Sequence, residues 1–326
     1  MSSFIIRRLL ISIPLVLLAS VLVFLLVANS GDPLADLKGR NPPVPPQVIE
    51  QREKTLGLDK PLPQRYWTWL TNFVQGDMGK TIRGVEVRPL LFQRLRITLR
   101  MVILASIIAI VLAIGAGVLS AVRQYTVTDY TFTFAGFLFL SMPVFWLAAL
   151  LKEYGAIRLN ALFGQQVVFT VGSETPNLTG SLGHRLADYA GHLVLPTLAL
   201  ALISFAAWSR YQRATMLDVI HDDYVRTARA KGVAERTVMR RHALRNALLP
   251  IITVFGLSFP VLLGGAVFVE RIFSWPGMGL LTVTAITKRD YHLVTGIVVI
   301  GSTMVVIGSL LADMLSAAVD PRLRRG

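Results

Sequence analysis

Long apolar runs recur along the chain and predict helices that cross a membrane. A helix that spans the roughly 30 Å hydrocarbon core needs about 20 consecutive, mainly apolar residues. The runs that meet this length are residues 9–28, 99–122, 130–151, 192–212, 250–270 and 293–316. The first run exceeds the apolar part of a signal peptide, about 7 to 15 residues, so we interpret it as a retained helix. The pattern predicts an all-α membrane protein with six transmembrane helices.

Two polar stretches between these runs are long enough to form structure of their own. Residues 29–98 contain a proline-rich stretch at residues 42–46, followed by amphipathic stretches around residues 48–56 and 63–74. These features predict a small helical insertion after the first helix. Residues 152–191 are rich in Gly, Ser, Thr and Asn, and we expect them to enter the mouth of a pore in part.

The distribution of Lys and Arg predicts the orientation, because these residues gather in short cytoplasmic loops. They flank matching ends of the runs as Arg7, Arg8, Arg123, the nine Lys and Arg residues from 210 to 245, and Arg322, Arg324 and Arg325. Both termini are therefore expected in the cytoplasm. The predicted division is a transmembrane helix at 1–29, an extracytoplasmic insertion at 30–98, a core domain with five helices at 99–316, a cytoplasmic loop at 214–249 within that core, and a cytoplasmic tail at 317–326.

The composition agrees with a membrane protein and argues against other classes. Hydrophobic residues make up 53% of the chain and charged residues only 16%, which is more apolar and less charged than an average globular protein. The net charge of +14 lies at the ends of apolar runs without interleaved aromatic residues, so we do not expect nucleic-acid binding. The chain has no Cys, no His pair at ligand spacing and no Ser, His and acid constellation. We therefore predict no catalytic residue, no metal and no cofactor.

The most informative polar segment lies between the fourth and fifth runs, at residues 222–250. Its two aspartates suit the start of a helix, and Gly232 suits the end because glycine readily adopts a positive φ. A second helix is expected from Ala234 through Arg245, until Pro250 resets the backbone at the membrane edge. The segment predicts a basic helix–turn–helix hairpin. The alternative is a loop that obeys the orientation rule and has no further role.

A resemblance gives this hairpin a function. Residues 224–232 (YVRTARAKG) and 241–250 (RHALRNALLP) resemble the coupling loop of ABC-importer permeases, in the branch that transports dipeptides, oligopeptides, nickel or glutathione. Arg226 and Thr227 replace the first two letters of the general Glu-Ala-Ala-x-x-x-Gly form, a departure that is typical of the peptide branch. The similarity to the B-type (first) permease subunit of oligopeptide transporters extends over residues 56–62, 76–79, 141–146 and 269–279.

The resemblance implies a type I ABC importer-like permease fold in the bacterial inner membrane. It implies a second permease subunit, two ATPase subunits or domains, an extracytoplasmic substrate-binding protein and membrane lipid as partners. Peptides would cross by alternating access, and ATP would be hydrolysed on the partner, so this chain is not itself an enzyme. The residues implied in ATPase coupling are Tyr224, Arg226, Ala228, Arg229, Ala230, Lys231, Gly232, Arg241 and Arg245.

A second group of residues lies within or at the ends of apolar runs and is a candidate for the translocation path. It comprises Pro143, Trp146, Lys152, Glu153 and Glu270. An ionisable side chain at membrane depth is costly unless it is paired or hydrated, and so favours a polar path. The alternative is that the three charged residues lie at the interface and reach water.

Residues 76–81 (GDMGKT) imitate part of a phosphate-binding loop, but Val74 occupies the position of the first glycine, so we expect no ATP site here. A nickel or glutathione importer permease of the same branch remains open. An ion-gradient-driven secondary transporter or channel, from a different class, predicts acidic residues in the middle of the runs, where this chain has none.

Overall fold

The computed structural model describes residues 2–39 and 41–319. The basic residues Arg322, Arg324 and Arg325 of the predicted tail lie outside the described residues, and so do the side chains of Arg7 and Arg8. The described secondary structure is helical, apart from one isolated bridge between Lys80 and Glu86. The all-α prediction is thus confirmed over the described residues.

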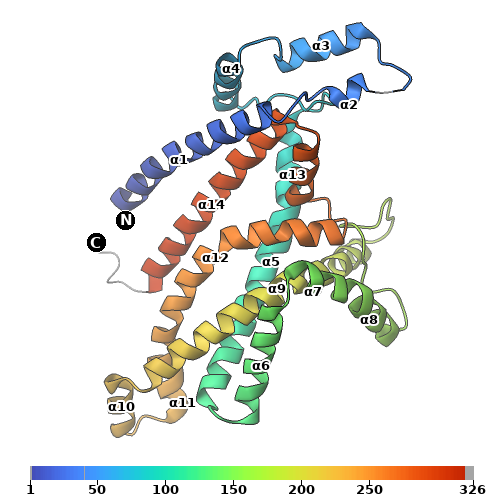
Figure 1. The fold of residues 1–326 in the computed structure, drawn as a ribbon. Coiled ribbons are helices and arrows are strands. Elements are labelled where there is room, and N and C mark those ends of the chain that lie inside the picture. Colours follow the sequence, from blue (N-terminus) through green and yellow to red (C-terminus); the bar gives the residue numbers. More distant parts are fainter. Residues whose placement is uncertain (1, 40, 320–326) are drawn as a thin grey trace. The chain divides into compact units, whose positions relative to one another are not determined.

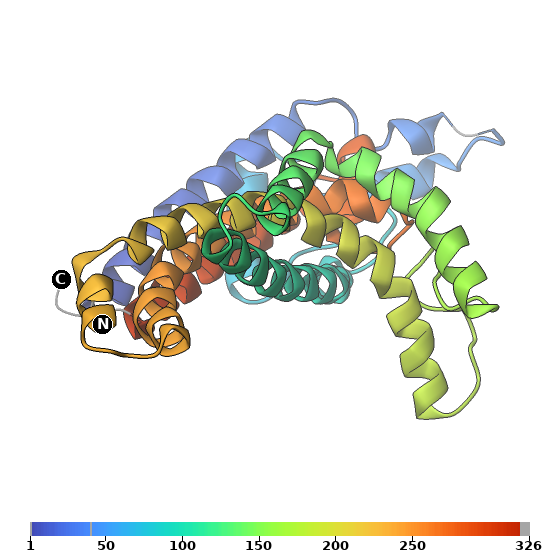
Figure 2. The same cartoon turned by 90° about the horizontal axis from the view of Figure 1, so that it is seen from below.

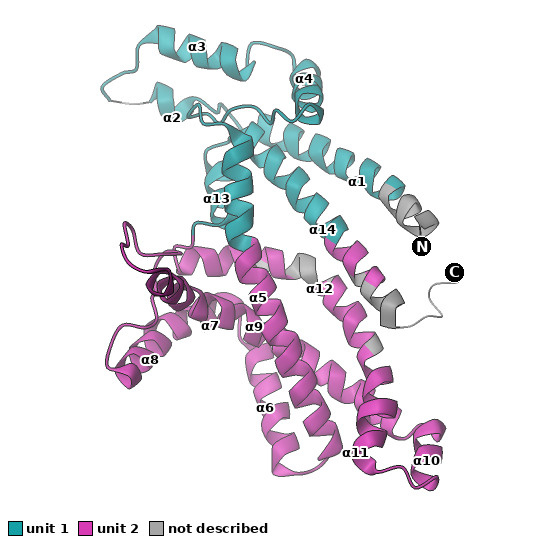
Figure 3. Ribbon diagram, turned by 180° about the vertical axis from the view of Figure 1, so that it is seen from behind, with its two compact units in different colours: residues 1–98, 276–307 teal, residues 99–275, 308–326 magenta. Residues whose placement is uncertain are grey.

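The chain divides into two compact units, which Figure 3 distinguishes by colour. Unit 1 comprises Met1–Thr98 and Pro276–Ile307, and unit 2 comprises Leu99–Trp275 and Gly308–Gly326. Unit 1 contains α1 (Ser2–Ala28), α2 (Ala35–Lys38), α3 (Pro46–Leu56), α4 (Leu62–Val74), α13 (Met278–Thr287) and the first parts of α5 (Val87–Val122) and α14 (Tyr291–Val319).

Unit 2 contains the rest of these two helices and the middle of the chain (Figure 1). Its other elements are α6 (Val127–Ser141), α7 (Val144–Leu150), the π-helical turn η1 (Leu151–Gly155), α8 (Ala156–Phe163), α9 (Leu182–Ile220), α10 (Asp223–Ala230), α11 (Glu235–Thr237), the π-helical turn η2 (Val238–Ala243) and α12 (Leu244–Ile272). Helix α9 packs against α6, α7 and α12.

The two amphipathic stretches predicted in the insertion form helices α3 and α4. Each begins with proline in its first turn, where the missing N–H group has no helical partner to lose. Their apolar faces join an aromatic cluster in which Trp69 of α4 and Leu56 of α3 lie buried with Phe24 and Tyr291. The rings of Phe24 and Tyr291 meet edge to face at 5.4 Å, a favourable geometry for aromatic pairs. This cluster fixes the insertion on α1 and α14 within unit 1.

A buried carboxylate ties the loop after α4 to the start of α14. Asp290 accepts hydrogen bonds from the backbone N–H groups of Ile82 at 2.8 Å and Leu293 at 3.3 Å. The second of these bonds caps the first turn of α14. Burial raises the pKa of Asp290, and the two N–H donors oppose that rise. The loop is therefore held by specific bonds rather than by apolar packing alone.

Among the described residues, four helices are long and apolar enough to cross a membrane by themselves, within α1, α5, α9 and α14. Four of the predicted runs are extended into longer helices, namely α1, α5, α9 and α14, and residues 250–270 lie inside α12. Residues 130–151 do not form the single helix that was predicted, although the two bent pieces together are long and apolar enough for one broken span. The chain bends by 107° between α6 and the helix that begins at α7.

The bend has a local cause at Met142 and Pro143. Met142 lies in the extended region, with φ −88° and ψ 125°. The ring of a following proline disfavours the helical conformation at such a residue, so helices end before it. Pro143 then precedes α7, whose first residue is Val144. The apolar run is continuous in composition, but its backbone is not continuous in direction.

Candidate functional site

The basic hairpin predicted from the sequence is formed by α10, α11, η2 and the start of α12. Figures 1 and 2 show α10 and α11 gathered at the carboxyl end of α9. Asp222 occupies the residue before α10 in an extended conformation, yet its side chain makes no capping hydrogen bond. Its backbone carbonyl accepts instead from the N–H groups of Val225 and Arg226. The helix thus begins as predicted, but without the side-chain cap.

The end of α10 is a Schellman turn. The N–H of Gly232 donates to the carbonyl of Arg229 at 2.9 Å, and the N–H of Val233 donates to that of Ala228 at 3.3 Å. This pair of bonds requires a positive φ at the glycine, and Gly232 has a φ of +77°. The predicted role of Gly232 as a helix terminator is confirmed. A side chain at this position would strain the backbone, although the space around it is open.

The second arm of the hairpin differs from the prediction. Helix α11 passes into the π-helical turn η2, and α12 then runs from Leu244 to Ile272 through Pro250. The expected break at Pro250 is therefore wrong. A proline costs one backbone hydrogen bond, which long apolar helices tolerate when their neighbours compensate. As a result, the second arm of the hairpin and the apolar part of α12 form one continuous helical segment, along which a force on that arm can be transmitted.

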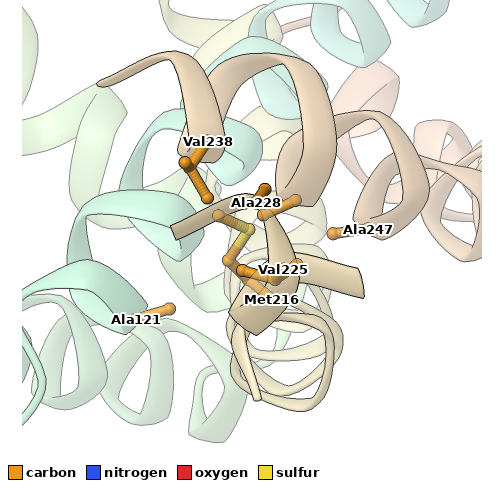
Figure 4. Close-up of a cluster of buried hydrophobic side chains, with 7 residues drawn as sticks. Ala121, Met216, Val225, Ala228, Val238 and Ala247 are labelled. Carbon is orange, nitrogen blue, oxygen red and sulfur yellow. The ribbon is translucent and has the colours of Figure 1, made fainter. Parts of the chain in front are cut away.

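The underside of the hairpin is apolar and rests on the ends of two long helices. Val225 and Ala228 lie three residues apart on one face of α10. Figure 4 shows them beside Met216 of α9, with Ala121 of α5 nearby. The buried cluster consists of Ala121, Met216, Val225, Ala228, Val238, Ala243 and Ala247. Full burial of a valine side chain contributes about 1.5–3 kcal/mol, so this cluster is the main attachment of the hairpin.

The residues predicted to couple to an ATPase divide between the two faces of the hairpin. Ala228 is only 8% exposed, so its methyl group supports α10 from inside and offers little surface to a partner. The exposed residues are Tyr224, Arg226, Arg229, Ala230, Lys231, Gly232, Arg241 and Arg245. The structure thus brings together a basic outer face with two small residues, Ala230 and Gly232.

Several outer residues are restrained by contacts within the hairpin. Arg229 donates to both carboxylate oxygens of Glu235, with Nη2 at 2.9 Å from Oε1 and Nε at 3.1 Å from Oε2. This pair holds the pKa of Glu235 below its usual range and raises that of Arg229. The hydroxyl of Tyr224 accepts a bond of 2.7 Å from the amide of Asn246. Both contacts bridge the two arms, so the outer face has a defined shape.

A buried ion pair below the hairpin was missed in the sequence analysis. Asp129 of α6 is 2% exposed and accepts two bonds from Arg213 of α9, from Nε at 2.7 Å and from Nη2 at 2.8 Å. The hydroxyl of Ser120 on α5 donates to the same carboxylate, and the N–H of Tyr125 donates at 3.0 Å. From the sequence, Arg213 is only one of the basic residues that indicate orientation. No spacing rule pairs it with Asp129, which lies 84 residues away in the chain.

This ion pair and the apolar cluster share the same two helix ends. Ser120 precedes Ala121 of the cluster on α5, and Arg213 lies one turn before Met216 of the cluster on α9. The paired charges thus hold α5, α6 and α9 together at the level where the hairpin is attached. The arrangement can pass a displacement of the hairpin to several long helices at once.

The candidates for the translocation path lie in unit 2 but do not all converge. Lys152 of η1 donates from Nζ to the carbonyl of Ile272 at 2.8 Å, which places it at the end of α12, two residues beyond the buried Glu270. Glu153 is exposed, as are Pro143 and Trp146 at the start of α7. The structure therefore associates Lys152 with the helix end that carries Glu270, and leaves the other three on open surfaces.

We predict that removing Arg213 and removing Asp129 lower the free energy of unfolding by different amounts. Arg213→Ala leaves the buried carboxylate of Asp129 without its cation and should lower the free energy of unfolding by about 3–5 kcal/mol. Asp129→Ala leaves a partly hydrated guanidinium and should cost about 1–3 kcal/mol. Apparent unfolding temperatures of the purified protein in detergent measure both. Asp218→Ala, at an exposed position of α9, is the matched control. Equal melting of all three variants would contradict the role given to the pair.

Comparison with known proteins places the chain in a family. The family model described as "Binding-protein-dependent transport system inner membrane component" matches residues 113–325, and the model of the N-terminal part of such components matches residues 1–90. Together they cover both units. The match includes the whole hairpin.

Three relatives are similar over almost their whole length. The oligopeptide transport system permease protein OppB of Mycobacterium tuberculosis is 41% identical over 324 residues, 99% of each chain. The corresponding protein AppB of Bacillus subtilis is 41% identical over 326 residues, again 99% of each chain. The glutathione transport system permease protein GsiC of Pectobacterium atrosepticum is 38% identical over 331 residues, with the same coverage.

Solved structures of ABC transporters share the fold. The inward-facing MetNI methionine transporter matches with a TM-score of 0.55 and 16% identity, over 71% of this chain and 96% of that chain. An amino acid ABC transporter matches with a TM-score of 0.51 and 18% identity, over 71% and 94%. These matches confirm the helical ABC importer permease architecture, and the resemblance drawn from the hairpin motif is confirmed as well. The chain belongs to the family of inner-membrane components of binding-protein-dependent transport systems, as a multi-pass membrane protein.

Proposed function

We propose that the protein is the B-type permease subunit of an ATP-driven importer that carries oligopeptides or dipeptides across the bacterial inner membrane. The observation that carries this proposal is the 41% identity, over 99% of both chains, to two oligopeptide permeases. The described helices suit this task, since α1, α5, α9 and α14 are long and apolar. With α12 and the bent α6 to α8 segment, they make six spans. Both termini then lie in the cytoplasm and the insertion after α1 lies outside.

The hairpin is the proposed contact with the ATPase. Its exposed basic residues can pair with carboxylates of a partner, and the small residues Ala230 and Gly232 allow close approach. Its apolar underside and its continuity with α12 connect that contact to the membrane helices. Nucleotide-driven closure of two ATPase subunits would then displace the hairpins of this chain and of a second permease. An extracytoplasmic binding protein would deliver the substrate.

The energy for the cycle comes from the partner. Shifting two access states from 1:99 to 99:1 takes about 5.5 kcal/mol of differential binding. The residues that resemble a phosphate-binding loop lack its first glycine, since Val74 stands there. The translocation path is proposed to include Pro143, Trp146, Lys152, Glu153 and Glu270. The contact of Lys152 with the end of α12 offers one place where that path can respond to movement of the hairpin.

Glutathione is the second candidate substrate, because the permease GsiC is 38% identical over the whole chain. The test is uptake into proteoliposomes that contain this protein with its genomic partner subunits and ATP. We expect uptake of labelled tri- to pentapeptides that depends on ATP and on the binding protein. If glutathione were taken up in preference to these peptides, glutathione would be the substrate instead. Uptake by this chain alone under an ion gradient would contradict the proposal.

Substitutions at Gly232 test the hairpin. Gly232→Arg strains a backbone with a φ of +77° and places a bulky charge on the proposed contact, so we expect loss of ATP-driven uptake and of co-purifying ATPase subunits. Gly232→Asn is the matched control, because asparagine tolerates a positive φ at low cost. It should retain most uptake. Normal uptake with Gly232→Arg, in protein that inserts at normal levels, would reject the hairpin as the coupling site.

A further inference from the structure

A basic cavity lies in unit 1. It has a volume of about 570 Å³ and is bordered by α3, α4, the segment that follows α4, and the start of α14. Figure 3 shows that these elements all belong to unit 1. The charged side chains in its lining are Lys54, Lys60, Arg65, Lys80 and Arg88, against Asp77 and Glu86. The cavity therefore carries a positive charge.

Much of this charge is not neutralised within the unit. Lys54 forms an ion pair with Glu50 at 2.6 Å, which raises the pKa of Lys54. Asp77 accepts a bond of 2.8 Å from the N–H of Gly79. Lys60 and Lys80 form no ion pair with any residue in the described ranges 2–39 and 41–319. Cations gathered around a cavity of this kind raise the local concentration of anions.

Two hydrogen-bond donors in the wall of the cavity lack an acceptor. Trp69 is only 3% exposed, and its indole Nε1 has no partner among the described residues. The Nε of Arg65 is also buried without a partner, while its guanidinium lies 4.6 Å from the ring centroid of Tyr291. Both nitrogens are closed off from solvent, so they belong to the packed wall and are not open to a ligand in the cavity.

The cavity is formed in advance by a restrained loop. Gly79 has a φ of +79°, and a Cβ atom there would lie 3.1 Å from Nδ1 of His292. The next residue, Lys80, bonds through its carbonyl to the same imidazole nitrogen at 3.0 Å. Asp290 fixes the loop again two residues later, through the N–H of Ile82. Because the loop is already ordered, a ligand would pay little conformational entropy to bind.

We propose that this cavity is a binding site for the carboxylate of a small molecule, held by the lining cations Lys60, Lys80 and Arg65. Its volume is within the range of about 300–1,000 Å³ that small-molecule sites occupy. The ligand we assign is the C-terminal carboxylate of a short peptide. This assignment rests on the proposed function, in which peptides reach the same outer side of the membrane.

Direct binding to the full-length permease in nanodiscs, without the soluble binding protein, tests the inference. Calorimetry would compare trialanine with its C-terminal amide, at low and at physiological salt. We expect the free acid to bind, the amide not to bind, and the affinity to fall as salt rises. Lys80→Gln and Lys60→Gln should each weaken binding by about tenfold, the size of one charge-assisted hydrogen bond.

A matched control lies three residues from Lys80. Arg83→Gln removes an exposed cation that does not line the cavity. This variant should bind trialanine normally. Equal binding of acid and amide, no binding of the acid, or variant-sensitive binding of inorganic phosphate alone would overturn the inference. ATP-driven uptake of trialanine, measured in parallel, separates the two claims, because uptake without cavity binding overturns only this one.

Discussion

The attachment of α10 to the ends of α5 and α9 is the interaction on which the proposed coupling depends. Val225 and Ala228 lie on the buried face of a short, strongly charged helix. Without these apolar contacts, little would hold the helix against its neighbours. A helix of this length is unstable by itself in water. Packing against Met216 fixes the position of α10, and the Schellman turn at Gly232 fixes where α10 ends. Its charged face is thereby held outward.

The buried pair of Asp129 and Arg213 adds stiffness at the same level. Three helices share this carboxylate, directly or through Ser120. Because a charge at this depth is costly when unpaired, the helices cannot separate here without a large penalty. The ends of α5, α6 and α9 to which the hairpin is attached are therefore held together. The continuous backbone of α12 through Pro250 provides a second connection, between the hairpin and the apolar part of α12.

The sequence predicted the elements that follow from local rules. Five of the six apolar runs, the amphipathic stretches around residues 48–56 and 63–74, and the start and end of α10 agree with the structure. The bend at Met142 also follows from a local rule, since a residue before proline disfavours the helical conformation. A search for runs of apolar residues alone does not detect this bend. The joining of Asp129 to Arg213, and the inward position of Ala228, depend on how helices pack. The sequence indicated the charges and the small residue but not their partners.

The chain contains no cysteine, so a single introduced thiol reports on one position alone. The most direct test of the coupling hairpin is site-specific cross-linking from Ala230→Cys, at the exposed end of α10, in membranes that contain all the partner subunits. The account predicts a cross-link to an ATPase subunit whose yield changes when ATP is added. A thiol at this position that reacts with impermeant reagents from outside intact cells, or that never reaches an ATPase, would contradict it.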